Sequence, residues 1–481
     1  MTKRIRLSAV LVCAQLAGCF AVHQRQDGAG AQGDGAGGGA DCRPGESTSA
    51  IPLDEDSPTS FDSVHGLVVA VDDAGTMYAA YGRNDAYTGE AGSLWLAVRA
   101  EGGAWTNERV VDAVTSDDVL MKVDDSGNVF LVFLEERTGW FTVAKRAPDG
   151  TWSQEQAAEA PAFVGGAPWG PIAEGRVQLM LDDSGNLFLV FVNERTGGIT
   201  LAKRAADGTW SQEQGPNALA GDETAPSYSA TMDASGRLYL IGVSSWKILL
   251  IERDVSGEWT RTTVANVVEE DSFGLFALDL AVGFAVGPDQ TVYVSYPTHL
   301  GAEFDSEPRG QLAIRSRDGV WNTETFFAGF ENGEGSTSSG LVVNANGSVF
   351  VAYVRYPLDP DDYQETLYVA ERTADGVWSM AMEHQERSCG SMEGIELAIS
   401  APNQPVATWH TGYCEGVGYG IGGGQEGFDW YLTPTGGVVG PLEPMDPDDY
   451  ALVSRSNQGS QNSYADLSDD GTFTLRTRCF D

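Results

Sequence analysis

The sequence predicts an all-β fold built from a four-stranded antiparallel unit that is repeated along the chain. The first observation is a phrase: "AKRAPDGTWSQEQ" at 144–156 returns as "AKRAADGTWSQEQ" at 202–214. The second is a series of apolar runs such as "VFLVF" at 129–133, each preceded by a turn rich in Asp, Asn and Gly. Such runs are typical of strands buried on both faces, and repeats near this period indicate stacked units that share a core.

The first half of each unit is a hairpin of two apolar strands, A and B. Its tight turn is rich in Asp and Asn and mostly ends in Gly, as a position with positive φ requires. Copies occur at 71–81, 123–133, 181–191, 232–242, 286–296, 343–353 and 400–410, and an eighth, "LSDDGTFTLRT", begins at residue 467.

The second half is a hairpin of strands C and D, and it contains the repeated phrase. Pro148, Asp149 and Gly150 suit a type I turn closed by a Gly bulge, which places Arg146 opposite Trp152. The same spacing recurs in Arg99/Trp105, Arg146/Trp152, Arg204/Trp210, Arg253/Trp259, Arg315/Trp321 and Arg372/Trp378. A guanidinium over an indole face stabilises a cross-strand pair, so we expect these pairs to be structural. Repeated ligand sites are the alternative.

Seven quartets of strands A to D can be drawn, at 64–111, 119–156, 176–214, 228–265, 279–327, 340–383 and 394–443. Residues 463–479 supply a further A–B pair, and a strand near 49–54 could complete the last unit. These units predict a β-propeller of seven or eight four-stranded blades over residues 46–481.

The N-terminus has the features of an export signal. Residues 1–18 combine a basic start with a short apolar segment, as in a secretory signal peptide. The "LAGC" at 16–19 resembles the lipobox of bacterial lipoproteins. That resemblance implies cleavage before Cys19, acylation of Cys19 and, because Phe20 rather than Asp follows, an outer-membrane location in the cell envelope. The Gly-rich residues 19–45 are then a flexible tether. An ordinary signal peptide with an unrelated Cys is the alternative.

Apart from the acylated Cys19, the exported chain has four cysteines: Cys42, Cys389, Cys414 and Cys479. Export would place them in an oxidising compartment. None has metal-site spacing, so we expect disulfides. Cys389 and Cys414 flank one predicted hairpin, and Cys42 and Cys479 lie at the two ends that ring closure brings together. The sequence leaves the two rival pairings open.

The composition limits the possible partners. Lys and Arg total 29 and Asp and Glu total 69, a net charge of −40, which excludes nucleic acid because phosphate binding needs clustered cations. We expect a monomer that meets the membrane only through its lipid. No G-x-S-x-G, H-E-x-x-H or P-loop motif occurs, so we assign no catalytic residue and no cofactor.

The B–C and D–A connections vary in length and share one face of the predicted ring, where binding sites usually lie. Candidate binding residues in or beside them are Tyr87, Trp169, Tyr356, Asp361, Asp362, Tyr363, Trp409, Tyr413 and Tyr419. Aromatic faces stack on sugars, and the acidic "DPDDY" at 359–363 and 446–450 could hold Ca²⁺. Packing at the rim and a solvated acidic turn are the alternatives.

The C–D turns, of the form x-D-G-x-W, resemble a shortened Asp-box of sialidase-like propellers. Fucose-type propeller lectins also repeat Arg, Glu and Trp in each blade, so a similarity to such lectins is the rival interpretation. The sequence therefore predicts a lipid-anchored propeller that binds a glycan or a protein, or serves as a scaffold. A glycan-active hydrolase or a lectin of sialidase-like propeller type is the alternative.

Overall fold

The computed structural model contains only strands and turns in the part of the chain that it describes. It describes residues 45–51, 62–85, 92–114, 119–159, 177–193, 198–217, 228–266, 268–269, 282–300, 309–328, 335–356, 365–386, 392–400, 404–411, 429–432, 438–439, 450–452, 461–467 and 473–479, apart from 73, 101–102, 136–137, 183, 245–246 and 298. Over these ranges, no helix is long and apolar enough to span a membrane.

Six consecutive four-stranded antiparallel sheets match the first six predicted quartets. Their strands are β2 (Asp62–Val71), β3 (Met77–Asp85), β4 (Gly92–Arg99) and β5 (Thr106–Val114); β6 (Leu120–Val123), β7 (Val129–Glu135), β8 (Trp140–Arg146) and β9 (Trp152–Glu159); β10 (Val177–Leu181), β11 (Leu187–Asn193), β12 (Gly198–Arg204) and β13 (Trp210–Asn217); β14 (Tyr228–Met232), β15 (Leu238–Ser244), β16 (Lys247–Arg253) and β17 (Trp259–Asn266); β19 (Gly283–Val286), β20 (Val292–Pro297), β22 (Arg309–Arg315) and β23 (Trp321–Ala328); and β24 (Gly335–Val343), β25 (Val349–Tyr356), β26 (Glu365–Arg372) and β27 (Trp378–Glu386).

Two further four-stranded sheets follow. One contains β28 (Met392–Ser400), β29 (Gln404–Thr411), β30 (Asp429–Leu432) and β31 (Val438–Val439). The other, the closing sheet, contains β32 (Tyr450–Leu452), β33 (Gln461–Leu467), β34 (Phe473–Cys479) and β1 (Gly45–Ile51). A short parallel pair joins β18 (Val268–Glu269) to β21 (His299–Leu300).

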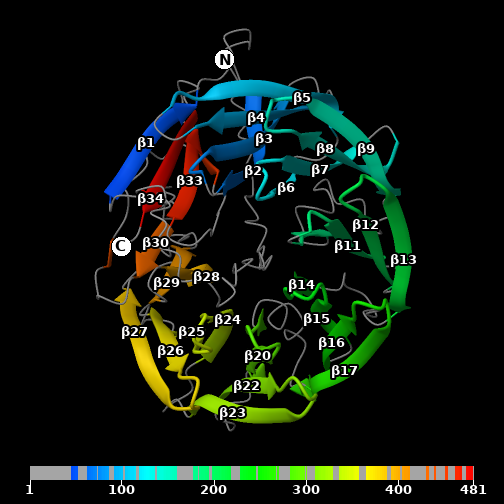
Figure 1. Cartoon of the computed structure of the whole chain (residues 1–481). Coiled ribbons are helices and arrows are strands. Elements are labelled where there is room, and N and C mark those ends of the chain that lie inside the picture. The colour runs from blue at the N-terminus through cyan, green and yellow to red at the C-terminus, as the bar shows by residue number, and fades with distance from the viewer. Residues whose placement is uncertain are drawn as a thin grey trace, which may run out of the picture.

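The sheets stand around one axis like the blades of a propeller (Figure 1). Strand A of each of the six repeated sheets lies toward the axis, and strand D lies on the circumference, where β5, β9, β13, β17, β23 and β27 follow one another. The all-β propeller predicted from the repeats is therefore confirmed.

Both ends of the chain contribute to the closing sheet. Strand β1 pairs with β34 along its whole length, with Gly45 opposite Cys479. The predicted closure by an N-terminal strand is thus correct, although that strand is 45–51 rather than 49–54. The expectation that 463–479 form an A–B pair is wrong, because β32 lies inside β33 and β1 lies outside β34. Strands β33 and β34 are therefore strands B and C.

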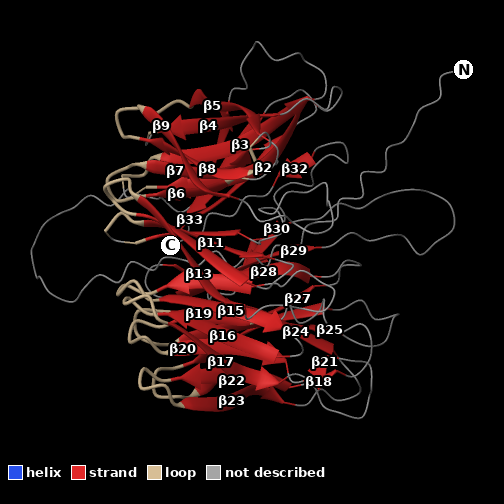
Figure 2. Ribbon diagram, turned by 90° about the vertical axis from the view of Figure 1, so that its right-hand side faces the viewer, coloured by secondary structure: helices blue, strands red, loops and turns tan. Residues whose placement is uncertain are grey.

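The short turns gather on one side of the ring (Figure 2). In the turn between β6 and β7, the Asp124 carboxylate accepts bonds from the backbone N–H groups of Ser126 and Asn128 at 2.9 and 2.8 Å. In the turn between β8 and β9, Gly150 has a φ of 85° and its N–H donates to the carbonyl of Ala147 at 2.9 Å. This is the predicted Gly bulge, and it leaves few backbone groups of the turn unsatisfied.

The hydrophobic core lies between neighbouring sheets, which explains the continuous apolar runs. In β7, Phe130 packs toward β10–β13 and Leu131 packs toward β2–β5, and both are buried. The rings of Phe141 and Phe191, from adjacent sheets, have centroids 5.2 Å apart. Alternate residues of one strand thus enter two different cores, so neither face of the strand needs polar side chains.

Candidate functional site

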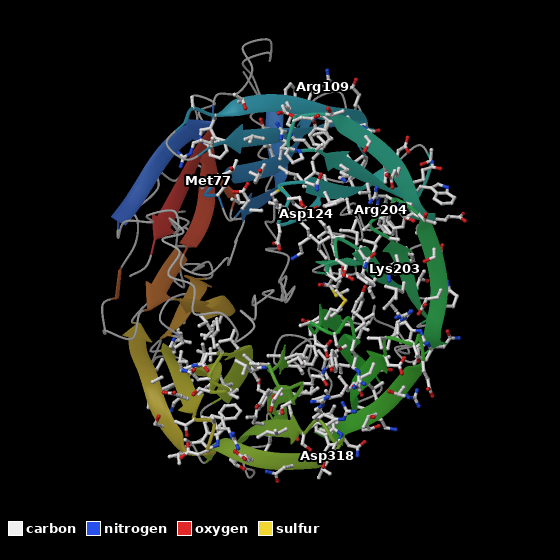
Figure 3. All side chains as sticks on the ribbon, in the orientation of Figure 1. Met77, Arg109, Asp124, Lys203, Arg204 and Asp318 are labelled. Carbon is white, nitrogen blue, oxygen red and sulfur yellow. The ribbon has the colours of Figure 1, made fainter. Side chains whose placement is uncertain are left out.

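The repeated Arg–Trp pair meets a carboxylate from the preceding blade. Arg204 ends β12 and lies opposite Trp210, the first residue of β13. Glu155 of β9 accepts bonds from Arg204 Nε and Nη2, both at 2.7 Å, and from Trp210 Nε1 at 2.8 Å. Figure 3 shows Arg204 at this junction between two blades. We call this arrangement of Arg, Trp and Glu the corner.

The same corner occurs at three other junctions. Its members are Arg146, Trp152 and Glu108; Arg253, Trp259 and Glu213; and Arg372, Trp378 and Glu324. In each, two guanidinium nitrogens and the indole N–H donate to a carboxylate. Charge-assisted bidentate bonds of this kind are the strong class of protein hydrogen bonds, and they fix the angle between two blades.

The repeated phrase supplies parts of two successive corners. Arg146 and Trp152 donate hydrogen bonds to Glu108 of the preceding blade. Glu155, three residues after Trp152, accepts hydrogen bonds from Arg204 of the following blade. Within its own blade, each acid lies opposite a Leu or Val of strand C that comes three residues before the Arg of that same blade. The pairs are Glu108 opposite Leu96, Glu155 opposite Val143, Glu213 opposite Leu201 and Glu324 opposite Leu312. The blades are therefore linked head to tail.

Sequence reasoning missed these four glutamates, although a signal was present. Glu follows the strand D Trp by three residues at 108, 155, 213 and 324, whereas Thr262 and Ala381 stand at the other two positions. Where Thr262 stands, Arg315 instead bonds Glu252 of β16 at 2.7 Å. Where Ala381 stands, the next sheet has Leu432 opposite Val438 in place of Arg and Trp.

The electrostatics match a set of permanent ion pairs. The bond from Arg204 lowers the pKa of Glu155, and the Glu155 carboxylate raises the pKa of Arg204 in return. Arg253 and Arg372 lower the pKa of Glu213 and Glu324 in the same way. These carboxylates stay ionised at neutral pH, so they act as anchors and not as proton donors.

The expected guanidinium–indole stacking occurs between Arg99 and Trp105, where the guanidinium carbon lies 5.3 Å from the centroid of the ring. At the four corners the two side chains share an acid instead. The side chains of Arg204 and Glu155 are 7% and 28% exposed, so the corner reaches the surface through the carboxylate. Its donors are already occupied, which favours a clamp between blades over a ligand site.

Most candidate binding residues lie outside the described residues: Tyr87, Trp169, Asp361, Asp362, Tyr363, Tyr413 and Tyr419. The backbones of Tyr356 and Trp409 belong to β25 and β29, where they pair with Gly335 and Trp430. Cys19, Cys42, Cys389 and Cys414 are likewise outside the described part, and Cys479 ends β34. The lipidation and disulfide assignments stay predictions.

The connections on one face of the ring, both within blades and between them, differ greatly in length. Only residues 245–246 separate β15 from β16, whereas residues 412–428 separate β29 from β30 and 160–176 separate β9 from β10. In the six repeated blades the turns of the other face are short and similar in length, spanning positions such as 124–128, 147–151 or 205–209. Among the described residues, no group of three His, Cys, Asp or Glu side chains could hold a metal ion.

No protein-family model matches the sequence, and no curated protein matches it significantly. Solved structures similar to it include a protein from Lactobacillus plantarum (14% identity, 79% of this chain and 94% of that chain, TM-score 0.40). The polysaccharide lyase Uly1 is another (10% identity, 89% and 94%, TM-score 0.44). A third is a variant of the sialidase NanB from Streptococcus pneumoniae (9% identity, 76% and 67%, TM-score 0.34).

Proposed function

We propose that this protein is a lipid-anchored β-propeller of the bacterial cell envelope that binds a glycan or a protein through the face bearing its variable connections. The observation that carries this proposal is the contrast between the two faces of the ring. On one face, the six repeated blades have short turns of similar length whose polar groups bond internally, as Asp124 does. The other is made of connections as different as 245–246 and 412–428. Variable loops on a rigid scaffold are a common basis for recognition.

The corners support the scaffold half of the proposal. Four junctions are joined by a bidentate ion pair, and a core of interleaved side chains fills the space between sheets. Such links between blades would fix the points at which the variable connections leave and re-enter the blades. Preorganised loops lose less conformational entropy on binding, which increases affinity for a given contact area.

The carboxyl groups of the corners and short turns do not suit the acid of a glycoside hydrolase. A glycoside hydrolase needs a carboxylic acid whose pKa is raised, so that it can protonate the leaving oxygen. Every described Asp or Glu with a shifted pKa is shifted downward, the glutamates by Arg partners and Asp149, Asp207 and Asp254 by turn hydrogen bonds. None of these shifted groups fits the role of that acid, which a hydrolase would have to take from another residue.

The anchor part of the proposal depends on "LAGC" at 16–19. Acylated Cys19 would hold the chain on the outer membrane, and the Gly-rich residues up to 45 would let the ring stand away from the lipid. Strand β1 begins at Gly45, opposite Cys479 at the end of β34. The tether would therefore enter the ring at the closing sheet.

A glycan array with the soluble Cys19→Ser variant, with and without Ca²⁺, tests the proposal. Two matched variants locate the binding face: one replaces 412–428 with a Gly-Ser linker, and the other is Glu155→Gln at a corner. We expect the loop replacement to abolish binding and Glu155→Gln to leave it unchanged. Binding that is lost in Glu155→Gln but kept in the loop variant would move the site to the corners, as in a lectin. Cleavage of any arrayed glycan would contradict a purely binding role.

A further inference from the structure

Among the described residues, one Arg of the repeated series, Arg99, has no carboxylate bonded to it. Arg99, at the end of β4, donates from Nη2 to the thioether sulfur of Met77 at 3.0 Å. Its Nε is buried and, in the part of the chain that the structure describes, has no hydrogen-bond partner. Arg146, Arg204, Arg253 and Arg372 each use this same nitrogen to bond a Glu.

The strand register explains the missing acid. The blade that contains Arg99 follows the closing sheet, so the acid would have to come from β1, the outer strand of that sheet. In β34, "TLRTR" at 474–478 matches "TLAKR" at 200–204, which puts Arg478 in the position of Arg204. Ser49 of β1 lies opposite Leu475, three residues before Arg478. In the same way, Glu155 lies opposite Val143, three residues before Arg146. The seam thus has Ser49 where four other junctions have Glu.

The buried Nε of Arg99, which has no hydrogen-bond partner among the described residues, is energetically unusual. A buried N–H without a partner loses its bonds to water and gains none in exchange, at roughly 1–3 kcal/mol. Burial lowers the pKa of Arg99, whereas a neighbouring Glu raises the pKa of Arg146, Arg204, Arg253 and Arg372. The other corners show what relieves this state: a planar carboxylate that accepts from two nitrogens of the guanidinium.

We propose that the Arg99 corner, at the seam between the closing sheet and the first blade, binds the carboxylate group of a small ligand in the position that Glu occupies at the other corners. A planar carboxylate fits the guanidinium fork with two parallel bonds. The ligand is a free small carboxylate or an acidic sugar such as a uronate. Met77, the present partner of Arg99, lies on the side of the blade that faces β33 and β34 (Figure 3).

This site is separate from the variable-loop face, because Arg99 is adjacent to a short C–D turn, in which the Gly103 N–H donates to the Ala100 carbonyl. Its Nε is covered in the closed ring, so the carboxylate enters when the seam opens and then holds it closed. Binding therefore stabilises the folded ring, and thermal unfolding reports it without knowledge of any biological ligand.

The test compares melting temperatures of Cys19→Ser protein in sodium acetate and in sodium chloride of equal ionic strength. D-glucuronate against D-glucose, with sodium matched, then distinguishes a sugar-borne from a free carboxylate. We expect acetate to raise Tm by about 2 °C, as saturation of one site would. Ser49→Glu fills the corner from within, so it should raise Tm in chloride and remove the response to acetate. Arg99→Met should remove the response without lowering Tm in chloride.

Thr262→Glu is the matched control for Ser49→Glu. Thr262 lies opposite Leu250, at the same register position, but its junction already has Glu252 on Arg315. Thr262→Glu should not raise Tm and should leave the acetate response intact. A response to acetate and glucuronate, or to acetate alone, supports the site. Equal Tm in acetate and chloride, or a response that persists in Arg99→Met, would overturn it.

Discussion

Glu155, in the outer strand of one blade, accepts two hydrogen bonds of 2.7 Å from Arg204, at the end of the third strand of the next. The two residues belong to consecutive copies of one phrase. The phrase is therefore repeated because each copy completes the corner of its own blade and supplies the acid of the following one.

Replacing the acid should weaken one junction. Glu155→Gln keeps the size of the side chain but leaves the buried guanidinium of Arg204 without its counter-charge, and should cost about 2–3 kcal/mol of unfolding free energy. Urea denaturation measures the change. Glu159→Gln, on the same strand but exposed, is the control and should change stability by less than about 0.5 kcal/mol. Equal losses in both variants would show that the Arg204 pair contributes nothing specific.

Stability should fall steeply in acid. The pKa values of Glu155, Glu213 and Glu324 are lowered by their Arg partners, so the stability they contribute is complete above the unfolded pKa of about 4.3. This contribution to stability is lost as the pH falls below the unfolded pKa and through the lower pKa values that these carboxylates have in the folded protein. From pH 7 to 5, early neutralisation of a net charge of −40 should raise stability instead. A pH series of Tm should therefore show a maximum near pH 5, and a steady decline from pH 7 would contradict this.

Two turn glycines should differ in a defined way. Gly319 and Gly376 have φ of 87° and 88°, so Ala at either position costs about 1–2 kcal/mol in a left-handed conformation. A Cβ at 319 meets nothing within 4 Å, whereas one at 376 lies 3.1 Å from Nη2 of Arg372. Gly376→Ala should therefore displace the guanidinium from Glu324 and lose more stability than Gly319→Ala. Equal urea midpoints would show that the corner tolerates the displacement.

The lipid anchor has its own test. Cys19→Ser removes the only thiol that a lipobox at 16–19 could present for acylation. We expect the variant to lose metabolic labelling with a fatty acid and to be either unprocessed or soluble. Cys42→Ser, which retains the lipobox, should still be labelled. Labelling of Cys19→Ser would refute the anchor.

How far the sequence predicts the fold is clear from particular residues. Turn glycines such as Gly150 and the pairing of Arg146 with Trp152 depend on a few neighbouring positions, so local chemistry is sufficient to place them. The partner of that pair, Glu108, is on another blade and requires knowledge of how blades stack. The match of "TLRTR" with "TLAKR" could have placed β34 as a strand C, but the "SDDG" before it resembles an A–B turn. Local similarity to the wrong turn produced that error.

The account's central claim is that the repeated phrase joins blades through Glu and Arg, and a double-mutant cycle on Glu155 and Arg204 tests it most directly. Urea unfolding of the single variants Glu155→Gln and Arg204→Met and of the double variant gives the coupling free energy. We predict a coupling of about 2 kcal/mol, because the second change removes a charge that the first has already left unpaired. Additive effects, with a coupling below about 0.5 kcal/mol, would contradict the account.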